Sequence, residues 1–112
     1  MGELKALAGK DDFDPANKHK PELMKALVHA ADIGNPSRPY ALCKDWAMRI
    51  LSEFFAQGDK ERALGLEITQ LCDRKTVNIG KGQIGFIDFV VYPYFEALSK
   101  LLPRMQYCLD EM

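Results

Sequence analysis

The sequence predicts an all-α chain, and three observations support that prediction. Apolar residues recur at spacings of three and four along two long segments, which is the period of an amphipathic helix. Glycine and proline stand at the ends of those segments, where helices begin and end. No segment alternates apolar and polar residues for long enough to indicate a strand. At 112 residues, the chain is one domain or a piece of one.

The first third of the chain predicts a short helix followed by a longer one. Residues 3–8 form a helical segment that stops at Gly9. The longer helix is expected to carry Pro21 in its first turn and to end at Gly34, before Asn35 and Pro36. Its predicted apolar face comprises Leu23, Met24, Leu27, Val28 and Ala31.

The middle segment has the strongest helical period of the sequence. Ser37 is its predicted N-cap, Pro39 lies in its opening turn, and Gly58 is expected to end it after Gln57. A separate short helix is then predicted from Asp59 to Leu64. The apolar face of the longer helix comprises Cys43, Trp46, Ala47, Ile50, Leu51 and Phe54.

The last third predicts a long loop and a second long helix. Residues 66–81 show no sustained period, which indicates an ordered loop of the kind that often carries function. A helix is expected from Gly82 to about Leu101, with a kink at Pro93. After the interruption at Pro103, residues 105–112 predict one more helical stretch.

Composition argues against several classes of protein. The formal net charge is −1, with fifteen basic residues scattered among sixteen acidic ones, so nucleic acid is not an expected partner. The longest apolar stretches are far shorter than the roughly 20 residues of a membrane span. The three cysteines, Cys43, Cys72 and Cys108, match no metal-binding spacing, and the first residues form no signal peptide. We therefore expect a cytoplasmic setting, although a parent protein could be tethered to a membrane elsewhere.

His29 and Asp32 are the first candidates for chemistry, because they lie three residues apart on one predicted helix. Such a pair can bind a metal ion or make a local hydrogen bond. The Asp32 carboxylate stands in the last helical turn, where the negative end of the helix dipole disfavours it. A nearby cation would offset this cost, and so would Arg38 or the amides of the following turn. The pattern leaves these alternatives open.

Gln83 and Phe86 form a second candidate pair, one helical turn apart. An amide offers a donor and an acceptor, which suits the edge of a purine, and a ring at the i+3 position can stack on its face. The alternative is an amide at a helix start and a phenylalanine in the core. Spacing alone favours that alternative.

Read together and in order, several segments resemble the class I cyclic-nucleotide phosphodiesterases. They are residues 27–36, Trp46-Ala47, residues 53–59, residues 72–74 and residues 81–89, and the resemblance extends from about Phe13 to Leu102. It implies that residues 1–112 are the C-terminal part of a catalytic domain, and hence a multi-helix fragment of a larger compact helical domain.

The resemblance also implies roles for particular residues. Asp32 would bind the tightly held metal, usually zinc, beside two histidines and another aspartate, whereas His29 would not bind it. Gln83 would hydrogen-bond the purine of either cyclic AMP or cyclic GMP, and Phe86 would clamp it. The other implied pocket residues are Asn35, Ile50, Phe54 and Leu71, with Leu71 and Gly82 near the rim.

The chemistry implied by the resemblance is metal-dependent hydrolysis of a cyclic nucleotide to the 5′-nucleotide. In the family, two metals, zinc and magnesium or manganese, hold the phosphate and supply a hydroxide, and a histidine protonates the departing O3′. The H-N-x-x-H and H-D segments that supply this histidine and the other ligands are absent from these 112 residues. We therefore expect no catalytic residue in this segment and no activity from the isolated chain.

Two departures from the family pattern and two other hypotheses remain. Gly34 and Cys43 stand where relatives often have serine and tyrosine, and both could reshape the pocket near Asn35. The chain could instead be a non-catalytic interaction module that self-associates through uncovered apolar faces. It could also be a free-standing metal-dependent hydrolase that uses His29 and Asp32.

Overall fold

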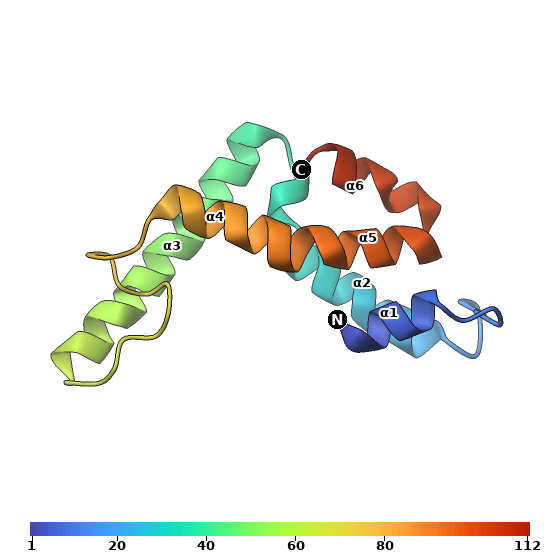
Figure 1. The fold of residues 1–112 in the computed structure, drawn as a ribbon, viewed down its shortest axis with the longest axis horizontal. Coiled ribbons are helices and arrows are strands. Elements are labelled where there is room, and N and C mark those ends of the chain that lie inside the picture. Colours follow the sequence, from blue (N-terminus) through green and yellow to red (C-terminus); the bar gives the residue numbers. More distant parts are fainter.

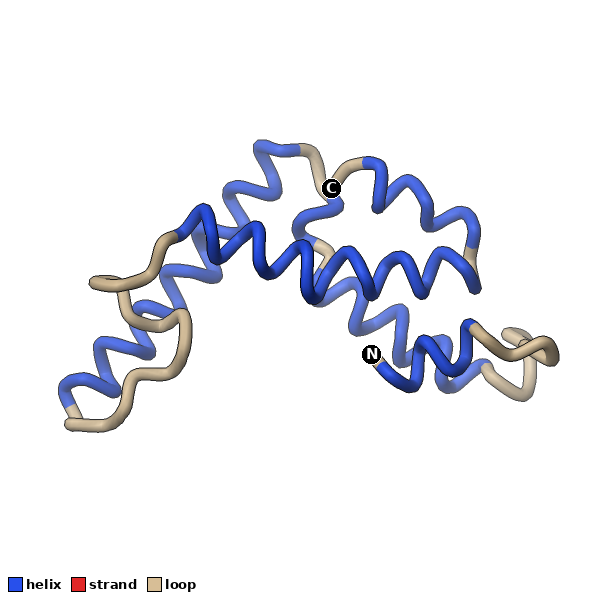
Figure 2. Tube along the Cα trace, viewed as in Figure 1, coloured by secondary structure: helices blue, strands red, loops and turns tan.

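The computed structural model describes all of residues 1–112, and every regular element in it is helical (Figures 1 and 2). The prediction of an all-α chain is therefore confirmed. The α-helices are α1 (Gly2–Ala8), α2 (Lys20–Ile33), α3 (Tyr40–Ala63), α4 (Ile79–Phe86), α5 (Tyr92–Leu101) and α6 (Gln106–Asp110). Three short turns connect them, namely η1 (Asn35–Ser37), η2 (Ile87–Val91) and η3 (Pro103–Met105). None of these helices is both long and apolar enough to span a bilayer.

The hydrophobic core surrounds α5, and we call this region the α5 core. Helices α1, α2 and α6 pack around α5, and the side chains of Leu98 and Val91 are completely buried there. The Tyr94 hydroxyl donates a hydrogen bond of 3.1 Å to the Ala26 carbonyl, which ties α5 to α2. The other buried members are Leu4, Leu23, Ala26, Ala30, Tyr94, Phe95, Ala97, Cys108 and Leu109.

The second region extends away from this core, and we call residues 40–86 the arm. It consists of α3, the long loop that follows it, and α4, which together form one end of an elongated molecule of 52 × 30 × 17 Å (Figure 1). In contrast with the α5 core, only Leu51, Gly58 and Cys72 are buried in the arm.

The arm corrects three predictions about its long helix. Helix α3 begins at Tyr40, so Ser37 is not its N-cap, and the Ser37 hydroxyl donates to the Gly34 carbonyl at 2.7 Å instead. The helix also continues through Gly58 to Ala63, so neither an end at Gly58 nor a separate helix from Asp59 exists. A Cβ atom on Gly58 would lie 2.0 Å from the carbonyl oxygen of Cys72. Glycine is therefore needed here for close approach of the loop, and not to end the helix.

The late helix begins earlier than predicted, at Ile79, because the Asn78 side chain caps it and accepts a hydrogen bond from the Lys81 amide at 3.0 Å. It then runs through the π-type turn η2 into α5. The turn ends just before Pro93, whose missing N–H and ring do not fit a regular α-helix. A kink at Pro93 stays a prediction, and α6 confirms the final helical stretch.

The predicted apolar face of α2 is largely wrong. Leu23 is buried as predicted, but its buried neighbours are Ala26 and Ala30, which face α5. Met24 and Val28, predicted to be buried, are 57% and 72% exposed. Small alanine side chains let α2 approach the large side chains of α5, and this rotates the larger apolar residues of α2 toward solvent.

Candidate functional site

An apolar hollow lies between α3 and α4, and we call it the α3–α4 hollow. It has a volume of about 660 Å³, part of which is open solvent. Six of the seven residues predicted to bind a ligand or metal line it, and they come from η1, α3, the loop and α4. They are Asn35, Ile50, Phe54, Leu71, Gln83 and Phe86, and the remaining lining residues are Pro36, Cys43, Ala47, Leu51, Val77, Ile79 and Gly82.

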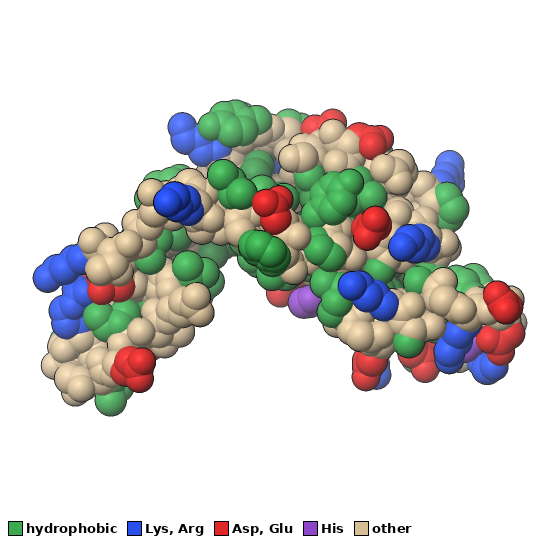
Figure 3. Space-filling model, viewed as in Figure 1, with side chains coloured by type: hydrophobic (Ala, Val, Ile, Leu, Met, Phe, Trp, Pro, Cys, Tyr) green, Lys and Arg blue, Asp and Glu red, His purple; other side chains and the backbone are tan.

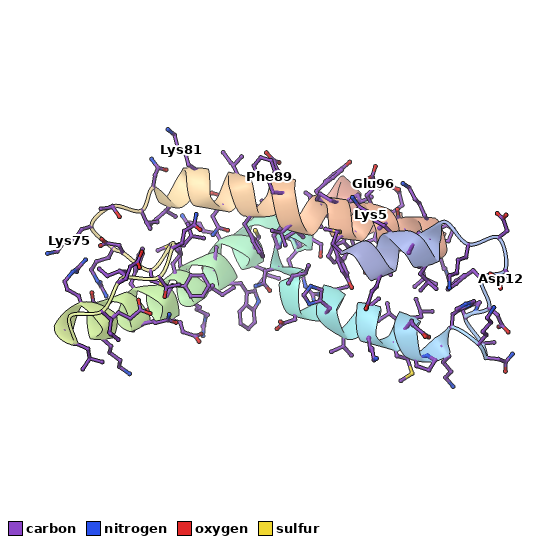
Figure 4. All side chains as sticks on the ribbon, turned by 60° about the horizontal axis from the view of Figure 1, so that its bottom comes forward. Lys5, Asp12, Lys75, Lys81, Phe89 and Glu96 are labelled. Atoms are coloured by element: carbon purple, nitrogen blue, oxygen red, sulfur yellow. The ribbon has the colours of Figure 1, made fainter.

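Helical spacing explains how the two walls of this hollow arise. Ile50 and Phe54 lie one turn apart on α3, and Gln83 and Phe86 lie nearly one turn apart on α4. Each pair therefore presents its side chains from one face of its helix. In Figure 4, Lys81 projects from α4 on the side away from α3, which leaves the opposite face of α4 toward the hollow.

Two polar side chains, those of Asn35 and Gln83, line the hollow, and Gln83 is half-buried in the α4 wall. None of the side-chain hydrogen bonds within the protein involves its amide; the nearest one in sequence is the cap of α4 by Asn78. The donor and the acceptor of this amide are therefore both available inside a mostly apolar surface. Such an amide can fix the orientation of a flat, hydrogen-bonding ligand.

The loop that closes one side of the hollow is tied to α3 by charged groups. The Glu61 carboxylate accepts hydrogen bonds from the Thr69 amide at 2.8 Å and the Thr69 hydroxyl at 2.7 Å. These bonds, together with one from Gln57, hold the pKa of Glu61 below its ordinary value. Arg62 pairs with Asp73 at 2.6 Å, and the Asp73 pKa is lowered first by the Lys75 amide and then by Arg62.

A second ion pair secures the outer part of the loop. The Arg74 guanidinium donates two hydrogen bonds to the Asp59 carboxylate, at 3.0 and 2.6 Å, and lies over the Phe55 ring. This bidentate geometry is the stronger form of such a pair. The neighbouring Lys75 lies at the outer edge of the arm (Figure 4). The loop is therefore ordered by polar contacts and buries few apolar side chains.

Leu71 has an unusual backbone conformation within this loop. Its φ angle is 70°, in the left-handed region that glycine adopts readily and leucine does not. The Cys72 amide donates to the Thr69 carbonyl at 2.9 Å, so residues 69–72 form a tight turn with Leu71 in its third position. A leucine there costs on the order of 1–3 kcal/mol.

Cys72 anchors the other end of this turn. Its backbone lies against Gly58 of α3, and its buried thiol has a pKa raised by desolvation and by the nearby Glu61 carboxylate. The turn is thus held on both sides, which keeps the Leu71 side chain at the wall of the α3–α4 hollow.

Asp32 lies outside the α3–α4 hollow, at the end of α2. It borders a neighbouring hollow that shares Asn35 and Ile50 with the first one. The Asp32 carboxylate is exposed and takes part in none of the ion pairs, so Arg38, which lines the same hollow, does not neutralise it.

His29 is not brought together with Asp32. The His29 ring packs edge-on against Tyr94, with ring centroids 4.9 Å apart, and it lines a different hollow between α1 and α2. The chain also contains no group of three or more His, Cys, Asp or Glu side chains that could hold a metal ion. A zinc site takes three or four such ligands.

Sequence reasoning missed two contributions to this site. Ala47 was assigned only to the apolar face of a helix, yet it lines the hollow beside Cys43, which the departure from the family pattern had already placed near the pocket. Glu61 was given no role, since a glutamate on a helix carries no sequence signal for a contact with a loop eight residues later. The contact is seen only in the structure, as the hydrogen bonds that Thr69 donates to Glu61.

Comparisons with known proteins all find members of one family. The family model described as 3′5′-cyclic nucleotide phosphodiesterase matches residues 1–112. The probable 3′,5′-cyclic-AMP phosphodiesterase pde-4 of Caenorhabditis elegans is 42% identical over 115 residues, which covers 100% of this chain and 17% of that protein. The 3′,5′-cyclic-AMP phosphodiesterase 4C of Rattus norvegicus is 42% identical over 92 residues, which covers 81% of this chain and 17% of that protein.

A solved structure is similar over nearly the whole chain. The structure of LmjPDEB1 in complex with IBMX matches with a TM-score of 0.90 and 35% sequence identity. The match covers 98% of this chain and 33% of that one. The chain therefore spans a minor part of the length of each of these relatives.

Proposed function

This chain belongs to the 3′5′-cyclic nucleotide phosphodiesterase family, and we propose that it forms the purine-binding wall of an enzyme that hydrolyses 3′,5′-cyclic nucleotides. The family resemblance inferred from the sequence is thereby confirmed. The part of the proposal that concerns this chain is that residues 1–112 form the C-terminal portion of the catalytic domain. Its role there is to bind and orient the base.

The observation that carries this proposal is the α3–α4 hollow. One of its two polar side chains, Gln83, has an amide with no hydrogen bond inside the protein, and most of its lining is apolar. In the proposed complex the Gln83 amide hydrogen-bonds the edge of the purine, and the Phe86 ring stacks on one face. Ile50 and Phe54 cover the other face. Each hydrogen bond contributes about 0.5–1.5 kcal/mol and the stack a similar amount.

The remaining candidate residues complete the pocket. Asn35 would contact the base end, and Leu71 would form a side wall. Because the Gln83 amide makes no bond within the protein, it can turn either end toward a ligand, and it therefore suits adenine and guanine. We propose cyclic AMP as the first substrate to test, since the curated relatives are named cyclic-AMP phosphodiesterases, and cyclic GMP as the second.

Asp32 is the proposed contribution of this chain to a metal site. Its carboxylate is exposed and unpaired, and it lines the adjoining hollow together with Asn35. We propose that it binds the tightly held ion, zinc, with magnesium or manganese as the second metal. Asp32 alone does not satisfy such an ion, so these metals require ligands from outside these 112 residues. The isolated chain is accordingly proposed to lack hydrolytic activity.

Two measurements test this proposal. The 112-residue chain is expected to turn over neither cyclic AMP nor cyclic GMP when zinc and magnesium are supplied, and measurable turnover would contradict the proposed division of roles. It is nevertheless expected to bind cyclic AMP, as measured by calorimetry. Gln83→Ala should weaken this binding about tenfold, since the proposed hydrogen bond to the base is lost.

Gln106→Ala is the matched control, because Gln106 lies on α6 and bonds only to Asp110. It should leave the affinity for cyclic AMP unchanged. Equal losses from Gln83→Ala and Gln106→Ala would show that the hollow is not the binding site.

Exposed apolar side chains favour one second candidate function, a helical module that self-associates. Phe89 is 81% exposed, Val28 is 72% exposed, and hydrophobic side chains are visible over the α4–α5 face (Figure 3). Surfaces of this kind often become interfaces. Light scattering would support this alternative by detecting a dimer, and a monodisperse monomer would exclude it.

We also propose a cytoplasmic setting, which rests on the cysteines. Cys43, Cys72 and Cys108 are all free, as suits a reducing compartment. Localisation of a fluorescent fusion would test this directly, and an extracellular signal would contradict it.

A further inference from the structure

We propose that Glu61 is a positioning residue for the α3–α4 hollow, because it holds the turn of residues 69–72 in the strained form that directs Leu71 into the ligand. This inference rests on the proposed function, since it assigns a role within the same pocket. Glu61 itself does not line the hollow, so it would act only through the turn.

The strain at Leu71 is the starting observation. A leucine at φ 70° in the third position of a turn is disfavoured, and a glycine or asparagine would fit the same backbone without that cost. Leucine nevertheless stands there, and its side chain lines the hollow. Strained residues persist where the surrounding structure fixes them, and they gather at ligand sites. The contacts that fix this one are therefore expected to matter for binding.

Glu61 supplies the contact at the first residue of the turn. One carboxylate oxygen accepts the Thr69 amide, and the other accepts the Thr69 hydroxyl and the Gln57 amide. A carboxylate is the side chain that satisfies all three donors at once, since both of its oxygens accept. A glutamine in its place would turn an NH₂ group toward one set of donors.

The second end of the turn has independent anchors. Cys72 is packed against Gly58, and Asp73 is paired with Arg62. Loss of the Glu61 contacts would therefore release Thr69 and Leu71 while the chain from Cys72 onward stays in place. The predicted effect is local to the hollow and does not require unfolding of the arm.

A double-mutant cycle on Glu61 and Leu71 tests this role, with IBMX as the probe because the similar solved structure contains it. The dissociation constant of IBMX is measured for the 112-residue chain, Glu61→Gln, Leu71→Ala and the double variant. We expect Glu61→Gln to weaken binding about fivefold in the parent chain and to have no further effect when Leu71 is already alanine. A merely structural glutamate would weaken binding equally in both backgrounds, and that result would overturn the proposal.

Two further variants keep the test decisive. Thr69→Val removes only the hydroxyl contact, so it covers the case in which Glu61→Gln fails to fold, and its smaller loss should also disappear beside Leu71→Ala. Glu67→Gln alters an exposed glutamate of the same loop and should leave the IBMX affinity unchanged.

The outcomes separate the two proposals. If the parent chain does not bind IBMX at all, the proposed function fails, and the role of Glu61 fails with it. If the parent chain binds IBMX but Glu61→Gln has no effect, or the cycle is additive, only the role of Glu61 is refuted.

Discussion

The α5 core and the arm are stabilised by different kinds of interaction. In the α5 core, large side chains such as Leu98, Val91 and Phe95 are almost completely removed from water. In the arm, apolar residues on α3 and α4 line an open hollow, and the loop is held by the carboxylates of Glu61 and Asp73. A region that keeps an apolar surface free for a ligand cannot use the same surface for its own stability. The arm is stabilised instead by hydrogen bonds and ion pairs, and by the close contact between Gly58 and the loop.

The largest expected effect lies in the α5 core. Leu98→Ala removes a fully buried side chain and should cost about 2–5 kcal/mol of unfolding free energy. Ile50→Ala, in the half-buried wall of the hollow, should cost only about 1 kcal/mol, because less apolar area is lost. Chemical denaturation of both variants measures the difference. Equal losses of unfolding free energy in the two variants would contradict the proposed difference between the α5 core and the arm.

The next effect concerns the glycine on which the arm depends. Gly58→Ala would place a Cβ atom 2.0 Å from the Cys72 carbonyl oxygen, so the loop must move, at a cost of about 2–4 kcal/mol. Gly82→Ala is the matched control, since a Cβ there meets no atom within 4 Å, and it should stabilise helix α4 by up to about 1 kcal/mol. The midpoint temperature of thermal unfolding should fall for Gly58→Ala and rise for Gly82→Ala. A shift in the same direction for both variants would contradict this role of Gly58.

A smaller effect should reveal the strain in the 69–72 turn. Leu71→Gly and Leu71→Ala remove nearly the same side chain, but only glycine is relaxed at φ 70°. The glycine variant should therefore be more stable than the alanine variant by about 1 kcal/mol, the reverse of the usual order. Denaturation midpoints of the pair test this, and the usual order would show that the turn is not strained.

The smallest effect is the response of the arm to acid. Hydrogen bonds hold the pKa values of Glu61 and Asp73 below their ordinary values. A lowered pKa in the folded state means that the stabilisation is present above the unfolded pKa and is lost as the pH falls through the folded pKa.

The Thr69 amide reports this acid response. Its exchange with solvent, corrected for the intrinsic rate, should accelerate below about pH 4, while exchange in α5 near Leu98 changes less. The reverse order, with α5 opening first, would contradict the assignment of polar stabilisation to the arm.

Much of the fold could be predicted from local sequence signals. The helical period and Pro21 located α2, and the helical period up to Leu101 located α5. Gly58 was misread because a glycine in a sequence looks the same whether it ends a helix or admits a neighbouring backbone. The cause lies at Cys72, fourteen residues away, and no local pattern contains it.

The candidate site was harder to predict from sequence patterns than the fold was. Spacing alone favoured a structural reading of Gln83 and Phe86, and only the family resemblance proposed a pocket. The structure adds that both residues share a hollow with Ile50, and that Asp32 lies in the adjoining one. The role of Glu61 depends on the conformation of a loop without periodicity, so the sequence contained no sign of it.

The central claim is that the arm, and not the α5 core, presents the ligand site. Mapping of backbone amide chemical shifts during titration with cyclic AMP tests this most directly. The account predicts shifts that concentrate at Ile50, Leu71 and Gln83 and leave Leu98 unchanged. Shifts that concentrate around α5, or no shifts at saturating nucleotide, would contradict it.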